Sequence, residues 1–259
     1  MKQQSIASKV AVDMFLVQSI WTAFFIGIYL LIRVVNIFIK GFLNGKEVTG
    51  FFNSVFFAGH LYMFIIGIFA IYFLPYFVGN GVTRKDYFKG AVVASFILSI
   101  MIPLVASIIA LIEKLLLNIL NISFYQVQNL NDLDMEGNFV ADIIMSFIIS
   151  PQIEFEINWL LSIALYIINL FTAYMVGWLI GASFYRFGTI NGLLTIVFAV
   201  FLKILTNSLL RITLDLPVLQ YFSILNNLSP NVALLGIIII ITISISIIRV
   251  LTKRVAVKM

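Results

Sequence analysis

The chain has 259 residues, of which 62% are hydrophobic and only 10% are charged. Because soluble domains usually carry about 25% charged residues, this composition excludes an ordinary soluble protein and predicts one polytopic membrane domain over residues 1–259. The absence of cysteine excludes disulfides, thiol catalysis and cysteine-bound metal. The net charge of +5 comes from cations in loops and the C-terminal tail, as membrane topology requires, so nucleic acid is not an expected partner.

Residues 1–18 have the pattern of a short amphipathic helix that lies in the membrane interface. Its apolar face is formed by Ile6, Val10, Met14 and Val17. A slightly polar start to the first membrane span explains the same pattern equally well.

Six apolar segments are long enough to cross a bilayer. They cover residues 20–39, 52–77, 91–112, 157–184, 190–210 and 232–248. Pro75 is expected to kink or end the second of them. Residues 118–156 form a polar, acidic outer loop. Its apolar stretch 139–149 is too short to span, and we expect it to rest at the membrane surface or against the bundle.

Six spans place both termini on one side of the membrane, and the cations select that side. The termini and the turns after the second and fourth spans hold ten cations: Lys2, Lys9, Arg84, Lys85, Lys89, Arg186, Arg249, Lys253, Arg254 and Lys258. The opposite loops hold four: Lys40, Lys46, Lys114 and Arg211. The positive-inside rule therefore predicts a multi-pass protein with both termini in the cytoplasm.

Motifs for independent catalysis are missing from the sequence. There is no G-x-x-x-x-G-K-[ST] phosphate loop, so the chain is not expected to hydrolyse ATP. There is no H-E-x-x-H motif, and we interpret the single histidine, His60, as a packed core residue and not as a proton relay or metal ligand. No motif of an intramembrane hydrolase is present. We therefore predict no catalytic, metal or cofactor site in this chain.

Charged residues within membrane spans usually mark function, because unpaired charge in hydrocarbon is costly. Two polar faces recur at helical spacing: Arg33, Asn36 and Lys40 on the first span, and Lys203, Asn207 and Arg211 on the fifth. If these faces meet, they line a cavity that opens outward. The alternative is that Arg33 and Lys203 snorkel to the headgroups. Neither span shows a partner acid at comparable depth, which argues against an ion-coupled secondary transporter.

The turn between the second and third spans, residues 79–90, is the densest cluster of charge in the first half of the chain. Thr83 is a suitable N-cap for a short cytoplasmic helix that presents cations and two aromatic rings to a groove on another protein. The residues of this helix are Arg84, Lys85, Asp86, Tyr87 and Phe88. On charge alone, the segment is explained equally by an inside loop that obeys the positive-inside rule.

The sequence Gly81-Val82-Thr83-Arg84-Lys85-Asp86-Tyr87 resembles the G-[VS]-[ST]-R-K-x-[FY] segment of ABC-2-type ATP-binding-cassette exporter permeases. In that family this segment is the coupling helix, which seats on the nucleotide-binding subunit. The family also has a proline-bearing outer segment that re-enters the membrane before the last span, and residues 216–222 and 228–230 look like it. The long acidic loop 118–156 departs from the family pattern.

The resemblance implies an all-α polytopic fold with six transmembrane helices, an N-terminal amphipathic helix, a cytoplasmic coupling helix and a re-entrant-like outer segment. It implies a permease subunit in a bacterial cytoplasmic membrane, paired with a second permease, identical or paralogous, and with an ABC ATPase that binds ATP and Mg. The apolar bundle favours a hydrophobic or amphipathic substrate, such as a peptide, an antimicrobial or a lipid-like molecule. The alternatives are a membrane assembly or binding protein without transport, and a secondary transporter.

Overall fold

The computed structural model describes residues 5–43, 50–119, 143–144, 146–147, 149–151, 153, 155, 157–218 and 220–256. Within these residues every regular element is a helix, and six helical segments are long and apolar enough to cross a membrane. The protein is therefore an all-α polytopic membrane protein, as its sequence predicts. Most of the predicted acidic loop lies outside the described residues, as do Lys2, Lys46, Lys258 and the side chain of Lys40.

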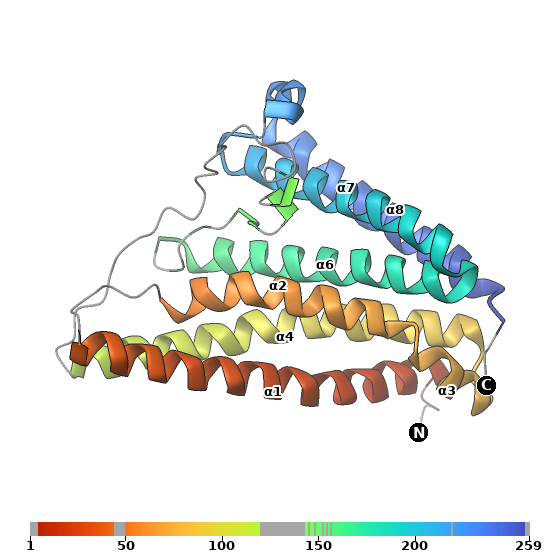
Figure 1. The fold of residues 1–259 in the computed structure, drawn as a ribbon, viewed down its shortest axis with the longest axis horizontal. Helices are drawn as coiled ribbons and strands as arrows, with labels where there is room; N and C mark the ends of the chain where they lie inside the picture. Colours follow the sequence, from red (N-terminus) through yellow and green to blue (C-terminus); the bar gives the residue numbers. More distant parts are fainter. Residues whose placement is uncertain are drawn as a thin grey trace.

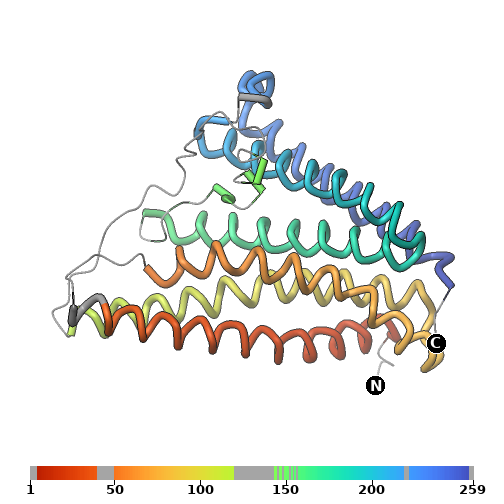
Figure 2. Tube along the Cα trace, viewed as in Figure 1, coloured from red at the N-terminus to blue at the C-terminus, as the bar shows by residue number. Residues whose placement is uncertain are grey.

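The first three spans are α1 (Ile6–Leu43), α2 with its continuation α3 (Phe51–Ala70 and Phe73–Gly79), and α4 (Arg84–Ile119). The last three are α6 (Trp159–Phe187), α7 (Thr189–Thr213) and α8 (Pro230–Lys253), and the 3₁₀ helix η1 (Gln220–Asn227) precedes α8. Successive spans run in opposite directions, so α1 begins and α8 ends at the same end of the bundle (Figure 1; Figure 2). We call this end, which also holds the α3–α4 and α6–α7 turns, the termini end, and the opposite one the distal end.

Helix α6 is the centre of the bundle. It packs on α2, α4, α7 and α8, whereas α1 packs mainly on α4 at one edge of the molecule (Figure 1). The backbones of α2 and α6 approach closely at glycines, because a Cβ atom added at Gly177 would lie 2.1 Å from the carbonyl oxygen of Phe64. Membrane helices commonly pack through such small residues, since lipid tails are as apolar as the helix surface.

Helices α1 and α4 are each continuous, which corrects two predictions about the first half of the chain. The predicted N-terminal amphipathic helix is not a separate element, because α1 is one 38-residue helix. Val10 and Met14 face the bundle and are buried, so the polar start of a long first span is the interpretation that holds. The predicted coupling helix is not separate either, because α4 continues from Arg84 to Ile119.

The second span is interrupted near Pro75, as predicted. Helix α2 ends at Ala70 and α3 begins at Phe73. The segment before α8 doubles back along α7, since the ring of Phe222 lies 6.4 Å from that of Phe201, twelve positions before the end of α7. This arrangement agrees with a re-entrant-like segment at the distal end.

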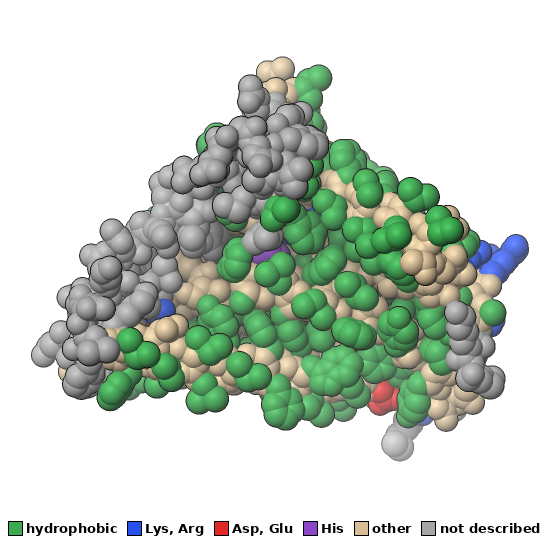
Figure 3. Space-filling view, in the orientation of Figure 1, with side chains coloured by type: hydrophobic (Ala, Val, Ile, Leu, Met, Phe, Trp, Pro, Cys, Tyr) green, Lys and Arg blue, Asp and Glu red, His purple; other side chains and the backbone are tan. Residues whose placement is uncertain are grey.

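The surface has the charge distribution of a membrane-spanning bundle. Hydrophobic side chains cover the long face in view, and most of the visible lysine and arginine side chains gather at the termini end (Figure 3). Eight cations among the described residues belong to this end: Lys9, Arg84, Lys85, Lys89, Arg186, Arg249, Lys253 and Arg254.

Candidate functional site

The turn between α3 and α4 is held by two backbone hydrogen bonds. The N–H of Val82 donates to the oxygen of Phe77, and the N–H of Gly81 donates to the oxygen of Val78, each at 3.0 Å. This pair of bonds is the Schellman motif that ends many helices, and it requires a left-handed residue. Gly81, at φ +81°, supplies that conformation. Its place in the motif is therefore explained by the end of α3.

Thr83 caps α4, as predicted. Its Oγ1 accepts a hydrogen bond from the backbone N–H of Asp86 at 3.1 Å and donates to the carboxylate of Asp86 at 2.6 Å. The Asp86 carboxylate also lies in the first turn of α4, where the positive end of the helix dipole favours an anion. Thr83 and Asp86 together fix where α4 begins.

Tyr87 does not present its ring to a partner, which corrects the prediction. The side chain is fully buried, and its hydroxyl donates a 2.6 Å hydrogen bond to the oxygen of Ala70. That oxygen lies at the break between α2 and α3, where the N–H of Leu74 bonds to Ile71 instead. Because Pro75 has no N–H, the local hydrogen-bond ladder is broken, and Tyr87 satisfies one carbonyl of the break.

Phe88 also turns toward the bundle. Its ring lies 5.8 Å from the ring of Trp178 in α6 and 5.2 Å from the guanidinium carbon of Arg249 in α8. Arg249 in turn donates to the carbonyl oxygen of Arg84 at 3.2 Å. The first turn of α4 is thus joined to α6 and α8, which leaves it little freedom to move alone.

Lys85 and Lys89 are the exposed cations of this turn. Of the predicted coupling residues, Gly81, Thr83, Asp86 and Tyr87 therefore build the turn, and Arg84 and Phe88 are partly buried against α8. The exposed surface of the turn is therefore cationic. Neither of its aromatic side chains is fully exposed.

Lys203 lies inside the bundle and does not snorkel. Its side chain is 1% exposed, and it is ten positions before the end of α7, which corresponds to about 15 Å of helix. Its Nζ donates to Oγ of Ser150 and Oδ1 of Asn169, each at 3.1 Å, and to Oδ1 of Asn207 at 3.0 Å. All three ammonium protons are used, and no ion pair within the described residues joins Lys203 to an acid.

The described part of the segment before α6 is held against α7 by this cluster. Besides the bond from Lys203 to Ser150, Nδ2 of Asn207 donates to the carbonyl oxygen of Ser146 at 2.8 Å. The ring of Phe147 lies 5.5 Å from that of Phe64 in α2. The apolar stretch predicted at 139–149 therefore packs on the bundle over its described residues.

Arg33 has an acidic partner, contrary to the prediction. Its Nε lies 2.7 Å from Oε1 of Glu113 in α4, and both side chains are largely buried. The other oxygen of Glu113 accepts the backbone N–H of Phe51 at 2.9 Å, at the start of α2. One carboxylate therefore ties α1, α2 and α4 together at the distal end.

The two polar faces do not meet, so the predicted cavity between them is wrong. Helices α1 and α7 lie on opposite sides of α2 and α6 (Figure 1). Asn36 is exposed on α1. Arg211 is buried at the end of α7, where its Nε donates to the carbonyl oxygen of Pro217 in the segment that follows.

His60 occupies a buried position in α2, as a core residue does. It is 1% exposed, and its Nδ1 lies 3.4 Å from the carbonyl oxygen of Phe56. Its ring meets the ring of Phe57 edge-on at 5.6 Å.

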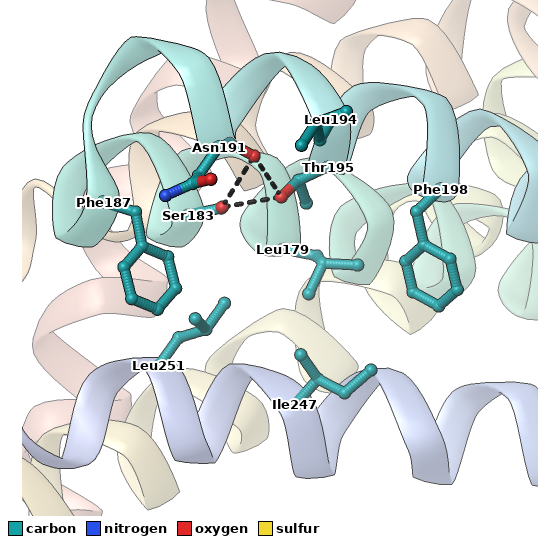
Figure 4. A pocket seen from close by; sticks show the side chains of 9 residues that line it. All are labelled: Leu179, Ser183, Phe187, Asn191, Leu194, Thr195, Phe198, Ile247 and Leu251. Atoms are coloured by element: carbon teal, nitrogen blue, oxygen red, sulfur yellow. Dashed lines mark hydrogen bonds between the residues drawn. The ribbon is translucent and has the colours of Figure 1, made fainter.

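A pocket of about 490 Å³ lies between α6, α7 and α8 (Figure 4). Its polar groups are on one wall, where the hydroxyls of Ser183 and Thr195 are 2.6 Å apart and Thr195 donates to the oxygen of Asn191 at 2.8 Å. The remaining walls are aliphatic or aromatic. No pattern in the sequence indicated this pocket.

No family model matches this chain, and comparisons with curated proteins and with solved structures return no match either.

The partners of Arg33 and Lys203 were not predicted from the sequence: Glu113 for Arg33, and Asn169 and Ser150 for Lys203. The signal available for Glu113 was its place at the outer end of its span, level with the outer half of the span that carries Arg33. For Asn169 it was a lone amide inside an apolar span, which calls for a polar partner.

Proposed function

We propose that this chain is the transmembrane permease subunit of a bacterial ATP-binding-cassette exporter of the ABC-2 type, with both termini in the cytoplasm. The ATPase is a separate partner chain that binds ATP and Mg, and a second permease subunit, a copy or a relative, completes the complex. The substrate is hydrophobic or amphipathic. The observation that carries the proposal is the fixed α3–α4 turn, which carries Lys85 and Lys89 on its surface at the termini end.

The α3–α4 turn is suited to transmit a movement of the ATPase to the helices of the bundle. Tyr87, Phe88 and Arg249 fasten it to α2, α6 and α8, so a displacement of the turn moves several helices together. Helix α4 carries that displacement over the 29 positions from Arg84 to Glu113, about 44 Å, to the Glu113 junction at the distal end. A docking groove on the ATPase is expected to be acidic, because the exposed side chains that it would meet are lysines.

Co-purification tests the proposal directly. A tagged chain is extracted in mild detergent from the cells that make it, and the retained ATPase is identified by mass spectrometry and nucleotide hydrolysis. Lys85→Glu/Lys89→Glu is expected to lose the ATPase while keeping its membrane insertion. Lys253→Glu/Arg254→Glu, with the same change of charge at the same end, serves as the matched control and is expected to retain it. A wild-type chain that retains no ATPase overturns the proposal.

A secondary transporter is the second candidate, and one observation favours it. Lys203 is a buried cation inside the bundle, and such residues often mark substrate or ion pathways. The two functions differ in their energy source. Efflux from reconstituted vesicles that needs ATP and the partner supports the exporter, whereas efflux by this chain alone under an ion gradient supports the secondary transporter.

A further inference from the structure

The pocket between α6, α7 and α8 has the depth of one membrane leaflet. It begins at Phe187 and Leu251, in the last turns of α6 and α8, and reaches Phe198 in α7. Phe198 is nine positions after Thr189, the first residue of α7, which corresponds to about 14 Å. Half of a hydrocarbon core of about 30 Å is nearly the same length.

The pocket opens sideways, toward the surface that faces lipid in a membrane-spanning bundle. Three lining residues are well exposed there: Phe187 at 49%, Leu194 at 67% and Phe198 at 41%. Leu179 and Leu251, which form its inner side, are buried. Its volume is within the range of roughly 300–1,000 Å³ that is usual for small-molecule pockets. A hydrocarbon chain can therefore enter from the bilayer without crossing water.

The rim at the termini end is cationic. The Arg186 guanidinium lies between two lining residues: its carbon is 5.0 Å from the Phe187 ring, and its Nη1 donates to the carbonyl oxygens of Val250 and Leu251. Lys253 and Arg254 follow Leu251 within one turn and are exposed.

No acid offsets this charge nearby among the described residues. The acids at the termini end are Asp13 on α1 and Asp86 on α4, and Asp86 is bonded to Thr83. On the pocket wall, Asn191 carries its side-chain amide on the Phe187 side (Figure 4). The rim thus combines cations with an amide donor, a set that suits a phosphate group.

We propose that this pocket binds an anionic phospholipid of the leaflet at the termini end, with an acyl chain against Leu179, Phe198 and Ile247 and the phosphate at Arg186, Lys253 and Arg254. The occupant is assigned to the bilayer because the mouth opens to the flank of the bundle and the pocket ends at the depth of one leaflet. This site is independent of the proposed exporter activity, since it needs neither an ATPase nor a second permease.

Native mass spectrometry of the full chain in mild detergent tests this site. The chain is titrated with phosphatidylglycerol and with phosphatidylcholine of the same acyl chains. One molecule of phosphatidylglycerol is expected to bind about tenfold more tightly than phosphatidylcholine, because cations near a membrane surface attract anionic headgroups. Ile247→Trp, which fills the pocket from α8, is expected to abolish this binding for both lipids.

Two charge variants separate the rim from the overall charge of the molecule. Lys253→Gln/Arg254→Gln is expected to remove most of the preference for phosphatidylglycerol. Lys85→Gln/Lys89→Gln removes the same charge at the same end, on α4, and is expected to leave the preference unchanged. Circular dichroism and thermal unfolding confirm that each variant is folded. An equal effect of the two double variants, or tight binding that survives Ile247→Trp, overturns the proposal. A dimer that forms in place of lipid binding and is lost in Ile247→Trp also overturns it, because the pocket then belongs to a contact between two copies.

Discussion

The hydroxyl of Tyr87, in the first turn of α4, donates a 2.6 Å hydrogen bond to the carbonyl oxygen of Ala70, the last residue of α2. This bond joins the start of one span to the break in the preceding one. The proline that causes the break leaves the local ladder incomplete, and the tyrosine repairs it from another helix. The α3–α4 turn is therefore part of the packed bundle, although its lysines are exposed.

Tyr87→Phe is expected to destabilise the protein without affecting its surface. The substitution leaves the buried oxygen of Ala70 without a donor, which costs about 1–3 kcal/mol. Thermal unfolding in detergent measures the effect. Tyr76→Phe, at a side chain that is 67% exposed, is the control and is expected to change stability by less than about 0.5 kcal/mol. Equal melting temperatures for the two variants would show that the bond to Ala70 contributes nothing.

Arg33 and Glu113 are expected to behave as a coupled pair. Either Arg33→Gln or Glu113→Gln leaves a largely buried charge without its partner, at a cost of about 3 kcal/mol. The loss of unfolding free energy in the double variant is expected to be smaller than the sum of the two single losses by about 1 kcal/mol or more. Unfolding of the four proteins of the cycle measures the coupling, with Asn36→Ala, one turn from Arg33, as the control for changes on α1. Strict additivity would contradict the pairing.

Lys203 is expected to hold the segment before α6 in place. The chain has no cysteine, so Ser146→Cys introduces a single thiol, at a site that is 3% exposed. Adding Lys203→Met to this variant removes charged hydrogen bonds to Ser150, Asn169 and Asn207. The segment is then expected to open more often, so maleimide labelling of the thiol at position 146 becomes about tenfold faster. Lys253→Met is the control, with no expected change. An unchanged labelling rate in the Lys203 variant would show that other contacts hold the segment against α7.

Local signals in the sequence predicted the turn and its cap at Thr83, which acts on Asp86 three residues away, so a short-range rule suffices. The part that Gly81 plays in ending α3 is equally local, but the sequence pattern placed Gly81 only in the coupling motif. The six spans are likewise a matter of local composition, and each appears as a helix.

The burial of Tyr87 differs from the prediction because the sequence pattern favours a short helix after Thr83, whereas α4 continues to Ile119. Continued through Gly90, α4 carries a stripe of fully buried residues at helical spacing: Tyr87, Ala91, Ala94, Leu98 and Ile102. The stripe is visible in the sequence, but in a membrane both faces of a helix are apolar, so hydrophobic periodicity alone does not show which face points inward.

The polar partners depended on how the helices are arranged. Arg33 and Glu113 are 80 residues apart and meet only because α1 packs against α4. The polar faces that carry Arg33 and Lys203 line a common cavity only if they meet, and they do not, because α1 and α7 lie on opposite sides of α2 and α6. Depth in the membrane follows from the sequence of each helix, whereas neighbours follow from packing between helices.

Gly177 is expected to tolerate no side chain, in contrast to Gly27. A Cβ atom at Gly177 meets the backbone of α2 at 2.1 Å, whereas a Cβ atom at Gly27 in α1 meets nothing within 4 Å. Gly177→Ala is therefore expected to cost about 1–3 kcal/mol through overpacking. Gly27→Ala is expected to be neutral or to stabilise by up to about 1 kcal/mol, because alanine favours the helix. Thermal unfolding of both variants measures the difference, and a Gly177 variant as stable as wild type would show that α2 and α6 can separate freely.

Single cysteines at the two ends of the bundle should fix its orientation in the membrane. Lys85→Cys and Arg254→Cys place a thiol at the termini end, and Ser223→Cys places one at the distal end, all at exposed positions. If the cation-rich end faces the cytoplasm, an impermeant maleimide added to intact cells labels only the Ser223 variant, and the other two react after permeabilisation. Reaction of the Lys85 and Arg254 variants in intact cells would reverse the topology. The exporter proposal would then fail as well, because a cytoplasmic ATPase could not reach Lys85 and Lys89.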